Sequence, residues 1–276
     1  MNYEQANSTL REIARLIDEK SCNPYEGELR TGVDLGTANI VLVVVDKDGN
    51  LVAGASQPST VVRDGIVVDY LGAVRTVRRL KDELEERLGV SLANAATAIP
   101  PGIIAGNVKV ISNVVEGADF NLTKVIDEPT AASHVLGVRD GAVVDVGGGT
   151  TGISILKDGE VVLTADEPTG GTHMTLVLAG AYGVSVEEAE TMKKDPEKER
   201  EVFPVIRPVA EKMASIVKNC LVGHEVETVH LVGGACTFSG FDDVFSKVLG
   251  LEICKPEEPL LVTPLGIALN CKGEAR

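Results

Sequence analysis

Short apolar runs separated by glycine turns dominate the chain from residue 31 onward. The first unit, TGVDLGTANIVLVVV, starts at Thr31, and a KDG turn at residues 47–49 separates it from a further apolar run at residues 51–55. Runs that are rich in Val and Ile and bounded by turn residues are typical of β-strands. We therefore predict three strands joined by two tight turns in this region.

The same pattern returns in the second half of the chain. GAVVDVGGGTTGISIL begins at Gly141, and another KDG turn at residues 157–159 and an apolar run at residues 160–163 follow it. Two copies of one unit of strands and turns indicate an internal repeat. The repeat predicts a duplicated fold with one glycine turn in each half, in which Asp34 and Asp145 occupy equivalent places.

Helical periodicity follows each copy. Residues 70–88 place aliphatic side chains on one face of a helix, and residues 174–182 and 204–221 show the same period in the second half. A charged segment at residues 192–202 interrupts the second half, and we interpret it as a solvated boundary between helix and loop. Strands that alternate with helices in this way define an α/β fold class.

A separate amphipathic helix is predicted near the start of the chain. Residues 8–20 carry aliphatic side chains at helical spacing behind Ser8, a residue that can cap a helix. The polar stretch at residues 21–27 contains proline and glycine and is typical of a linker. Two interpretations stay open, because such a helix either docks in a groove of another protein or packs on its own domain.

Charge narrows the choice of partners. The chain has 41 acidic and 26 basic residues and a formal net charge of −15, and a surface of this sign repels nucleic-acid phosphates. We expect no nucleic-acid partner. A polyphosphate ligand stays compatible, because backbone N–H groups and Mg²⁺ hold phosphates without an excess of lysine.

Cysteine and hydropathy patterns indicate a cytoplasmic protein. The five cysteines are odd in number and form no C-x-x-C pair, which argues against a disulfide framework and against a zinc ribbon. The four histidines show no ligand spacing. The apolar runs are too short for a membrane span, and charges throughout residues 1–20 argue against a cleavable signal peptide. We expect no membrane partner.

The two V-D-x-G turns carry the candidate chemistry. Glycines allow successive backbone N–H groups to point into one concavity, where they bind phosphate oxygens, while the aspartate at the strand end faces the same cleft. Two aspartates that face each other imply a cation between them, and hydrated Mg²⁺ is the natural ion beside phosphates. We assign this role, through bound water, to Asp34 and Asp145. The alternative is that both aspartates only cap their own turns.

Five motifs resemble the actin, Hsp70 and sugar-kinase superfamily. GVDLGTAN and VDVGGGTTGISIL are similar to its two phosphate motifs, IDEPTAASHVLG to its first connecting helix, VHLVGGACTFSGF to its adenosine loop and PLLVTPLGIALN to its second connecting helix. They occur in the family's order and cover nearly the whole chain.

The resemblance implies a definite architecture. It implies two duplicated actin/Hsp70-like (ribonuclease H-like) α/β domains, with a nucleotide cleft between them and minimal outer subdomains. Domain I would comprise residues 29–139 and 255–276, and domain II would comprise residues 140–254. Residues 1–28 would form the preceding helix and linker.

The resemblance also implies a set of site residues and the cofactors ATP or ADP and Mg²⁺. Catalysis would fall to Glu128, which orients the attacking water, together with Asp34 and Asp145. His173, beside a glycine turn, is the histidine expected closest to the nucleotide. The residues expected to contact the nucleotide are Gly36, Thr37, Ala38, Gly147, Gly148, Gly149, Thr150, Thr151, Gly170, Gly171, Glu211, Lys212, Gly233, Gly234 and Ala235.

Two departures from the Hsp70 pattern predict slow hydrolysis. The chaperones carry a catalytic lysine after the first hairpin, and residues 58–69 contain none. Gly152 stands where those chaperones have an acidic residue. Positioning and charge stabilisation supply most of the catalysis of phosphoryl transfer, so the loss of one cationic group lowers the rate by orders of magnitude while binding survives.

The chain as a whole is similar to the chaperonin-like family of ethanolamine microcompartment operons. This resemblance implies a chaperone-type role for enzymes of ethanolamine utilisation or for microcompartment assembly, with microcompartment enzymes or shell proteins as partners and the N-terminal helix as a candidate docking element. Self-association into a homo-oligomer also stays open. The alternatives are a nucleotide-dependent actin-like scaffold or filament protein and an iron–sulfur electron-transfer ATPase; a sugar or acetate kinase is disfavoured, because no general base or substrate-binding insertion is apparent.

Overall fold

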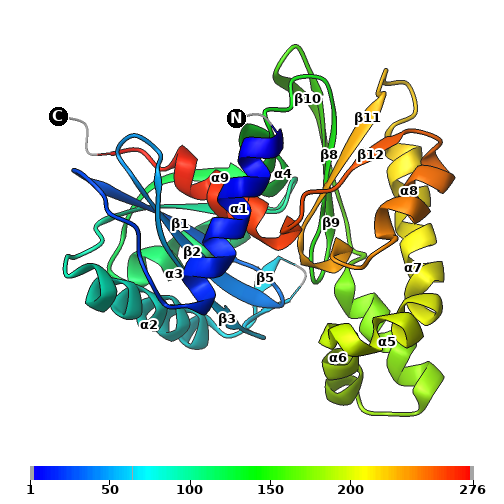
Figure 1. Cartoon of the computed structure of the whole chain (residues 1–276), viewed down its shortest axis with the longest axis horizontal. Coiled ribbons are helices and arrows are strands. Elements are labelled where there is room, and N and C mark those ends of the chain that lie inside the picture. The colour runs from blue at the N-terminus through cyan, green and yellow to red at the C-terminus, as the bar shows by residue number, and fades with distance from the viewer. Residues whose placement is uncertain (1–2, 64, 274–276) are drawn as a thin grey trace.

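The computed structural model describes residues 3–63 and 65–273 and contains two five-stranded sheets that lie side by side (Figure 1). The strand order is β3-β2-β1-β6-β7 in the first, called sheet I, and β10-β9-β8-β11-β12 in the second, called sheet II. In each sheet the first three strands pair antiparallel, and the last two run parallel to the central strand. The duplicated α/β fold is therefore confirmed.

The first half of the chain builds sheet I, a short hairpin and four helices. The strands are β1 (Leu29–Leu35), β2 (Asn39–Asp46), β3 (Leu51–Pro58), β4 (Val62–Arg63), β5 (Ile66–Val67), β6 (Asn94–Ile99) and β7 (Asn121–Asp127). The helices are α1 (Tyr3–Asp18), α2 (Tyr70–Leu88), α3 (Ala105–Gly117) and α4 (Glu128–Leu136).

The second half builds sheet II and the remaining helices. The strands are β8 (Gly141–Val146), β9 (Thr151–Lys157), β10 (Glu160–Glu167), β11 (Thr228–Val232) and β12 (Glu252–Cys254). The α-helices are α5 (Gly171–Tyr182), α6 (Val186–Lys194), α7 (Glu199–Cys220), α8 (Phe241–Leu249) and α9 (Val262–Asn270). Three 3₁₀ turns are η1 (Pro196–Lys198), η2 (Gly234–Cys236) and η3 (Pro259–Leu261).

Local sequence explains the best-defined helix. The Asp69 side chain caps the start of α2 by accepting a hydrogen bond from the Gly72 amide, and Gly89 ends the helix with a φ of 69°. The bounds predicted from periodicity, residues 70–88, agree with the structure. The predicted helix at residues 204–221 begins five residues earlier in the structure, at Glu199, and contains Pro204 and Pro208 in its interior.

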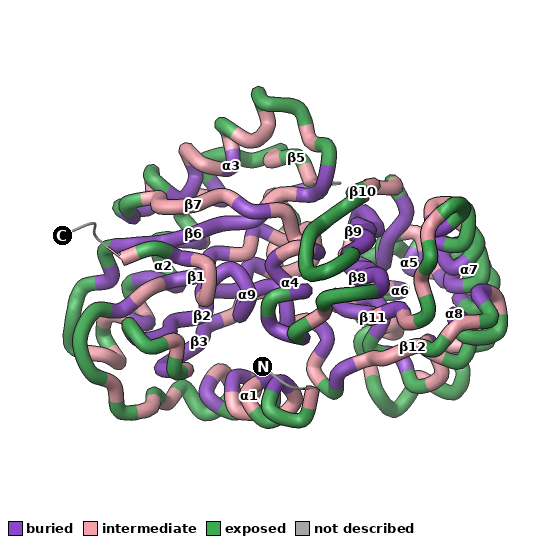
Figure 2. Tube along the Cα trace, turned by 90° about the horizontal axis from the view of Figure 1, so that it is seen from above, coloured by how far each residue is buried: buried purple, intermediate pink, exposed green. Residues whose placement is uncertain are grey.

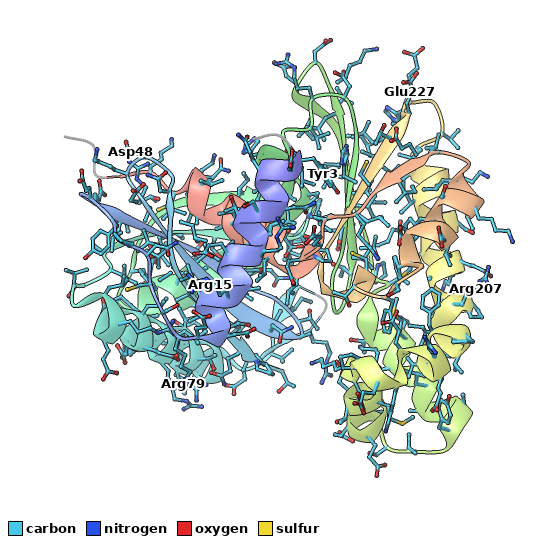
Figure 3. All side chains as sticks on the ribbon, in the orientation of Figure 1. Tyr3, Arg15, Asp48, Arg79, Arg207 and Glu227 are labelled. Atoms are coloured by element: carbon cyan, nitrogen blue, oxygen red, sulfur yellow. The ribbon has the colours of Figure 1, made fainter. Side chains whose placement is uncertain are left out.

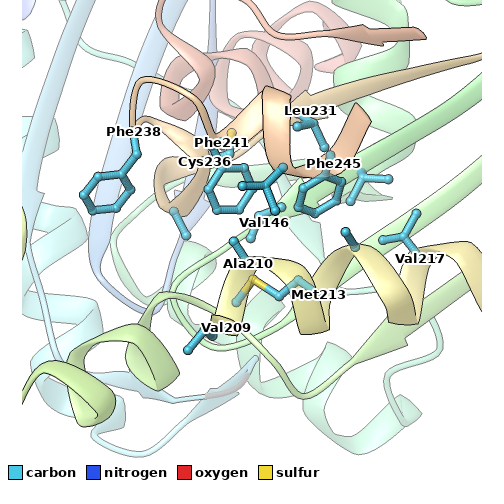
Figure 4. Packing of buried hydrophobic residues seen from close by; sticks show 14 of the residues in the cluster. Val146, Val209, Ala210, Met213, Val217, Leu231, Cys236, Phe238, Phe241 and Phe245 are labelled. Atoms are coloured by element: carbon cyan, nitrogen blue, oxygen red, sulfur yellow. The ribbon is translucent and has the colours of Figure 1, made fainter. Parts of the chain in front are cut away.

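Each sheet has its own apolar core. Sheet I buries one face against α2 and α3, and sheet II packs against α7 and α8. Figure 4 shows the second core, in which Phe241 and Phe245 stack with ring centroids 5.1 Å apart beside Met213 of α7. Burial of one such aromatic side chain contributes about 2–3 kcal/mol.

Helices α4 and α9 form the connection between the two sheets. An added Cβ on Gly266 of α9 would lie 2.1 Å from the carbonyl oxygen of Ala131 in α4, and an added Cβ on Gly32 of β1 would lie 2.4 Å from the backbone nitrogen of Ala268. Backbones approach this closely only where no side chain intervenes. Helix α9 is thus packed tightly against both α4 and the central strand of sheet I.

Helix α1 lies along the β3 edge of sheet I (Figure 2). Its side chains Ala6, Leu10, Ile13 and Leu16 are fully buried. Of the two interpretations of this helix, packing on its own domain is the one that the structure shows. At the start of α1, the centroid of the Tyr3 ring lies 6.1 Å from that of the His230 ring in sheet II, so the helix contacts both sheets. Figure 3 shows Tyr3 on the side of α1 that faces sheet II.

Within the described ranges, no helix is both long and apolar enough to cross a membrane.

Candidate functional site

The two repeated glycine turns face each other across one cavity. The first turn joins β1 to β2 and contains Gly36, Thr37 and Ala38, and the second joins β8 to β9. An added Cβ on Gly148 of the second turn would lie 3.1 Å from the Cβ of Thr37 and 3.2 Å from that of Ala38. The cavity has a volume of about 530 Å³ and takes lining residues from both halves of the chain. The sequence repeat thus corresponds to a single site.

Most of the predicted site residues line this cavity. They are Asp34, Gly36, Thr37, Ala38, Glu128, Asp145, Gly147, Gly148, Gly149, Thr150, Gly171, Gly233, Gly234 and Ala235.

Three carboxyl groups line the cavity, and the pKa of each is raised. Burial and the nearby charge of Asp145 raise the pKa of Asp34 to about 7. Burial also raises the pKa of Asp145 to about 6. The pKa of Glu128 is raised well above its usual value by burial and by the charges of Asp145 and Asp34. The charge of Asp145 therefore disfavours the ionisation of both Asp34 and Glu128, and the charge of Asp34 disfavours that of Glu128.

The three carboxyl groups would suit a hydrated cation. Within the described residues, no group of three or more His, Cys, Asp and Glu side chains is placed to ligate a metal ion directly. Mg²⁺ keeps several of its waters and is commonly held by one or two carboxylates together with substrate phosphates. Asp34 and Asp145 would hold such an ion through water, and its charge would relieve the repulsion between them.

The carboxylate of Asp145 is held by a hydroxyl group of another helix, whereas a turn-capping aspartate would be held by backbone amides of its own turn. The Thr263 hydroxyl of α9 donates a hydrogen bond of 2.5 Å to Oδ2 of Asp145. For Asp145, the structure therefore gives a partner outside its own turn, in place of the backbone amides that a capping role would use.

Glu128 is positioned by the start of α4. The preceding residue, Asp127, caps the helix by accepting a hydrogen bond of 2.9 Å from the Thr130 amide. Glu128 is the first residue of α4 and lines the cavity beside Asp34 and Asp145.

The start of α5 closes against the second glycine turn. The Gly171 amide donates to the Gly147 carbonyl at 2.9 Å, and the Thr172 amide donates to the Gly148 carbonyl at 2.7 Å. An added Cβ on Gly170 would lie 2.7 Å from the Gly147 oxygen. Gly170 therefore supports the turn from behind while Gly171 lines the cavity.

Two residues near this turn support it without lining the cavity. The Thr151 hydroxyl donates to the Thr169 carbonyl at 2.6 Å and is buried. His173 accepts a hydrogen bond from the Gly170 amide through Nδ1. Both residues hold the β10 to α5 connection in place.

Glu211 and Lys212 do not lie at the cavity. Glu211 pairs with Arg207 on the outer side of α7, where Figure 3 shows Arg207 pointing away from sheet I. The structure therefore does not bring these two residues, which were expected to reach the nucleotide, to the cavity. Other charged residues line the cavity here: Glu190, Lys193 and Lys194 come from α6, Asp195 follows it, and Glu199 is the first residue of α7.

Lys193 is the main lining residue that the sequence analysis missed. Its Nζ donates to the Gly171 carbonyl at 3.0 Å and to the Thr175 hydroxyl at 2.7 Å, and it forms an ion pair of 2.6 Å with Glu190. The side chain is 11% exposed, and burial lowers the pKa of this ammonium group. The signal in the sequence was the Glu190 and Lys193 pair at i,i+3, of which Lys193 falls inside the segment, residues 192–202, that was interpreted as a solvated boundary.

The structure also bears on the two departures from the Hsp70 pattern. Among the described residues, the lysines that line the cavity, Lys193 and Lys194, both come from the second half of the chain. The β4–β5 hairpin, which lies in the segment where the chaperones carry their lysine, contributes Val62 and Gly65 to the lining. An added Cβ on Gly152 would lie 3.3 Å from Cδ of Pro101. A proline therefore crowds the place that an acidic side chain would need.

Comparisons with known proteins agree with this geometry. The family of cell division protein FtsA matches residues 142–266. Ethanolamine utilization protein EutJ of Escherichia coli (strain K12) is 43% identical over 251 residues, which cover 91% of this chain and 88% of the relative. The crystal structure of EutJ from Carboxydothermus hydrogenoformans matches with a TM-score of 0.93 and 50% identity, over 98% of this chain and 99% of that one.

A more distant structure shares the fold. MreB5 of Spiroplasma citri, solved with bound AMPPNP, matches with a TM-score of 0.71 at 17% identity, over 87% of this chain and 95% of that one. Two duplicated sheets around a cleft with paired glycine turns define an actin-like ATPase fold. Within that class, the chain belongs to the family of ethanolamine utilization protein EutJ. The resemblance inferred from the sequence motifs is confirmed.

Proposed function

We propose that this protein binds ATP or ADP with Mg²⁺ in the cavity between sheets I and II and hydrolyses ATP slowly. The observation that carries the proposal is the direct approach of the two glycine turns, with Gly148 against Thr37 and Ala38, beside three carboxyl groups. An anionic ligand alone would be repelled by these carboxylates, whereas a phosphate that arrives with a divalent cation would not.

Different residues of the cavity would contact different parts of the nucleotide. Backbone amides of the two turns would bind the phosphates, and Gly233, Gly234 and Ala235 would border the adenosine. Glu190 and Lys193, which line the cavity, would meet the ribose or the base edge. Mg²⁺, when bound, would supply positive charge at the phosphates. Glu128 would orient the attacking water and accept its proton.

Slow turnover follows from the charges at the site. The lysines that line the cavity belong to α6, and Lys193 is already engaged by Glu190, Thr175 and Gly171. No described cation from the first half lies among the lining residues to stabilise charge at the transferred phosphoryl group. The lack of a cation at the transferred phosphoryl group lowers the rate of hydrolysis more than it weakens nucleotide binding.

The family context favours a role in ethanolamine utilisation. We propose a chaperone-type protein that assists enzymes of this pathway or the assembly of their microcompartment, in the cytoplasm, with domain opening coupled to the nucleotide. A nucleotide-dependent scaffold is the second candidate, and the likeness to the fold of MreB5 favours it.

Binding is tested by calorimetry with ADP and ATP in the presence of Mg²⁺ and of EDTA. Asp34→Ala and Asp145→Ala should each weaken Mg²⁺-dependent binding about tenfold or more. Asp48→Ala, which alters an exposed turn between β2 and β3, is the matched control and should bind like the wild type. Equal affinity of all four proteins would remove the proposed mechanism.

The placement of the adenosine is tested by two lysine variants. Lys193→Ala should weaken ADP binding, while Lys212→Ala should leave it unchanged. The opposite result would restore Lys212 of α7 to the site.

A pull-down from cells grown on ethanolamine tests the proposed cellular role. If it recovers no ethanolamine-utilisation enzyme and no shell protein, the chaperone role is contradicted. Sedimentation of the protein only in the presence of ATP would favour the scaffold.

A further inference from the structure

Thr263 is a buried hydroxyl residue at the point where α9 enters the cavity. It is 3% exposed and belongs to the first turn of α9. Its Oγ1 donates the hydrogen bond of 2.5 Å to Oδ2 of Asp145. This short hydrogen bond to a carboxylate is of the strong, charge-assisted kind when Asp145 is ionised.

The other side of the same carboxylate is confined by backbone. Gly233 has a φ of 93°, and an added Cβ on it would lie 2.3 Å from Oδ1 of Asp145. The carboxylate of Asp145 is therefore enclosed between a hydroxyl donor and a glycine backbone. Among the described residues, Asp34 receives no hydrogen bond from a hydroxyl group, so the two equivalent aspartates differ in how they are held.

The hydrogen bond also joins the cation site to the connecting helix. The Gly233 amide donates to the Pro259 carbonyl at 2.9 Å, so the segment before α9 holds the adenosine loop. The remainder of α9 packs on sheet I, where the Ala268 backbone lies against Gly32. Thr263 thus hydrogen-bonds a helix packed on sheet I to the aspartate at the end of β8 in sheet II.

We propose that Thr263 is a positioning residue for the cation site, and that its hydroxyl fixes the orientation of the Asp145 carboxylate toward the Mg²⁺ that accompanies the nucleotide. The inference rests on the proposed function. Groups that hydrogen-bond to a metal-binding carboxylate orient it, and their loss typically weakens metal binding by about 10-fold to 100-fold.

The test measures ADP affinity twice for each protein, once in excess Mg²⁺ and once in EDTA. The ratio of the two affinities reports the contribution of the cation. Thr263→Val keeps the shape of the side chain and removes the donor, and it should lower this ratio on the order of tenfold. Thr263→Ser keeps the donor and should retain most of the wild-type ratio. The affinity in EDTA should stay the same in all three proteins.

A double-mutant cycle separates positioning from a structural effect. In the Asp145→Asn background, Thr263→Val should produce no further fall in the ratio, because the carboxylate that it orients is gone. Thr263→Ala supplies a second protein without the hydroxyl should the valine variant fail to fold. Equal loss of affinity with Mg²⁺ and with EDTA would mean a structural role and would overturn the inference.

Failure of this inference can be told apart from failure of the proposed function. A wild-type protein whose ADP affinity is the same with Mg²⁺ and with EDTA would overturn both. If the wild-type protein binds ADP much more tightly with Mg²⁺ than with EDTA, and Thr263→Val leaves this ratio unchanged, only the role of Thr263 is overturned.

Discussion

The outer antiparallel strands β3 and β10 hold equivalent places in the two sheets, yet their surroundings differ. In β3, Val52 and Ala53 are fully buried, and Gly54 lies against α1, where an added Cβ on it would lie 2.9 Å from Cγ1 of Ile17. In β10, Val161 and Val162 are 37% and 52% exposed. A register shift between Val161 and Leu163 disturbs the pairing of β10 with β9, and such irregularity discourages edge-to-edge association. The two halves share a strand order, and one of them uses an added helix to cover its edge.

The largest change in the free energy of unfolding is expected from a substitution in helix α1, which covers the β3 edge. Leu10→Ala removes a fully buried side chain of α1 and should lower the free energy of unfolding by about 3 kcal/mol, because the cavity beneath the helix cannot fill. Val162→Ala on the exposed edge should change it by less than about 0.5 kcal/mol. Urea denaturation of both variants measures the contrast. Similar losses in the two proteins would mean that the two edges are stabilised alike.

The central strands give a second contrast between the halves. Gly32 of β1 and Val143 of β8 hold equivalent places two residues before the paired aspartates. Val143 is fully buried among side chains, while an added Cβ on Gly32 would lie 2.4 Å from the backbone of α9. The asymmetry arises because α9 returns to sheet I and crosses it at backbone distance.

Gly32→Ala should therefore destabilise the protein by about 2–3 kcal/mol, since backbone must move to admit the methyl group. Gly180→Ala is the matched control, because no atom lies within 4 Å of the place of its added Cβ. The control sits inside helix α5, where alanine is favoured over glycine by about 0.5–1 kcal/mol. Thermal unfolding of the two variants should shift in opposite directions; a Gly32→Ala protein as stable as the wild type would contradict the close approach of α9.

Much of this architecture could be predicted from local sequence. The period of α2, its cap at Asp69 and its end at Gly89 all lie within one segment, so its bounds were predicted correctly. The paired turns were found because the repeat places Asp34 and Asp145 in copies of one pattern. Both cases depend on residues that are close in sequence or repeated in it.

Contacts between distant segments could not be predicted in the same way. Lys193 meets Gly171 because α6 folds back on α5, and Thr263 meets Asp145 across 118 positions of sequence. Neither contact leaves a local pattern. Glu211 and Lys212, which the family resemblance implied, have suitable chemistry but are exposed on α7.

The paired aspartates give the third contrast. The pKa of Asp34 rises from 3.8 to about 7, and that of Asp145 rises from 3.8 to about 6 while the Thr263 hydrogen bond opposes the rise. For an acid whose pKa is higher in the folded state, ionisation costs stability. This cost is absent below about pH 4, grows as the pH rises toward the folded pKa, and is complete above it.

Asp34→Asn should accordingly be more stable than the wild type at pH 8, by on the order of 2 kcal/mol, less than the full shift implies because the side chain keeps some contact with solvent. The difference should vanish near pH 4. Urea denaturation in EDTA without nucleotide measures it, and Asp48→Asn is the exposed control. A difference that does not depend on pH would show that Asp34 is not strained by its charge.

The smallest effect is expected where α1 meets the segment before α9. Arg11 contacts both carboxylate oxygens of Glu257, at 2.7 and 2.8 Å, but the two side chains are 55% and 52% exposed. Exposed ion pairs contribute at most about 1 kcal/mol, so Arg11→Ala should lower the free energy of unfolding by about 0.5 kcal/mol, and less in high salt. Arg207→Ala, which breaks an exposed pair on α7, is the matched control. If Arg11→Ala instead cost as much as Leu10→Ala, α1 would be held by its charged contact with the connecting segment, and the difference between the two sheet edges would owe less to apolar burial than the structure indicates.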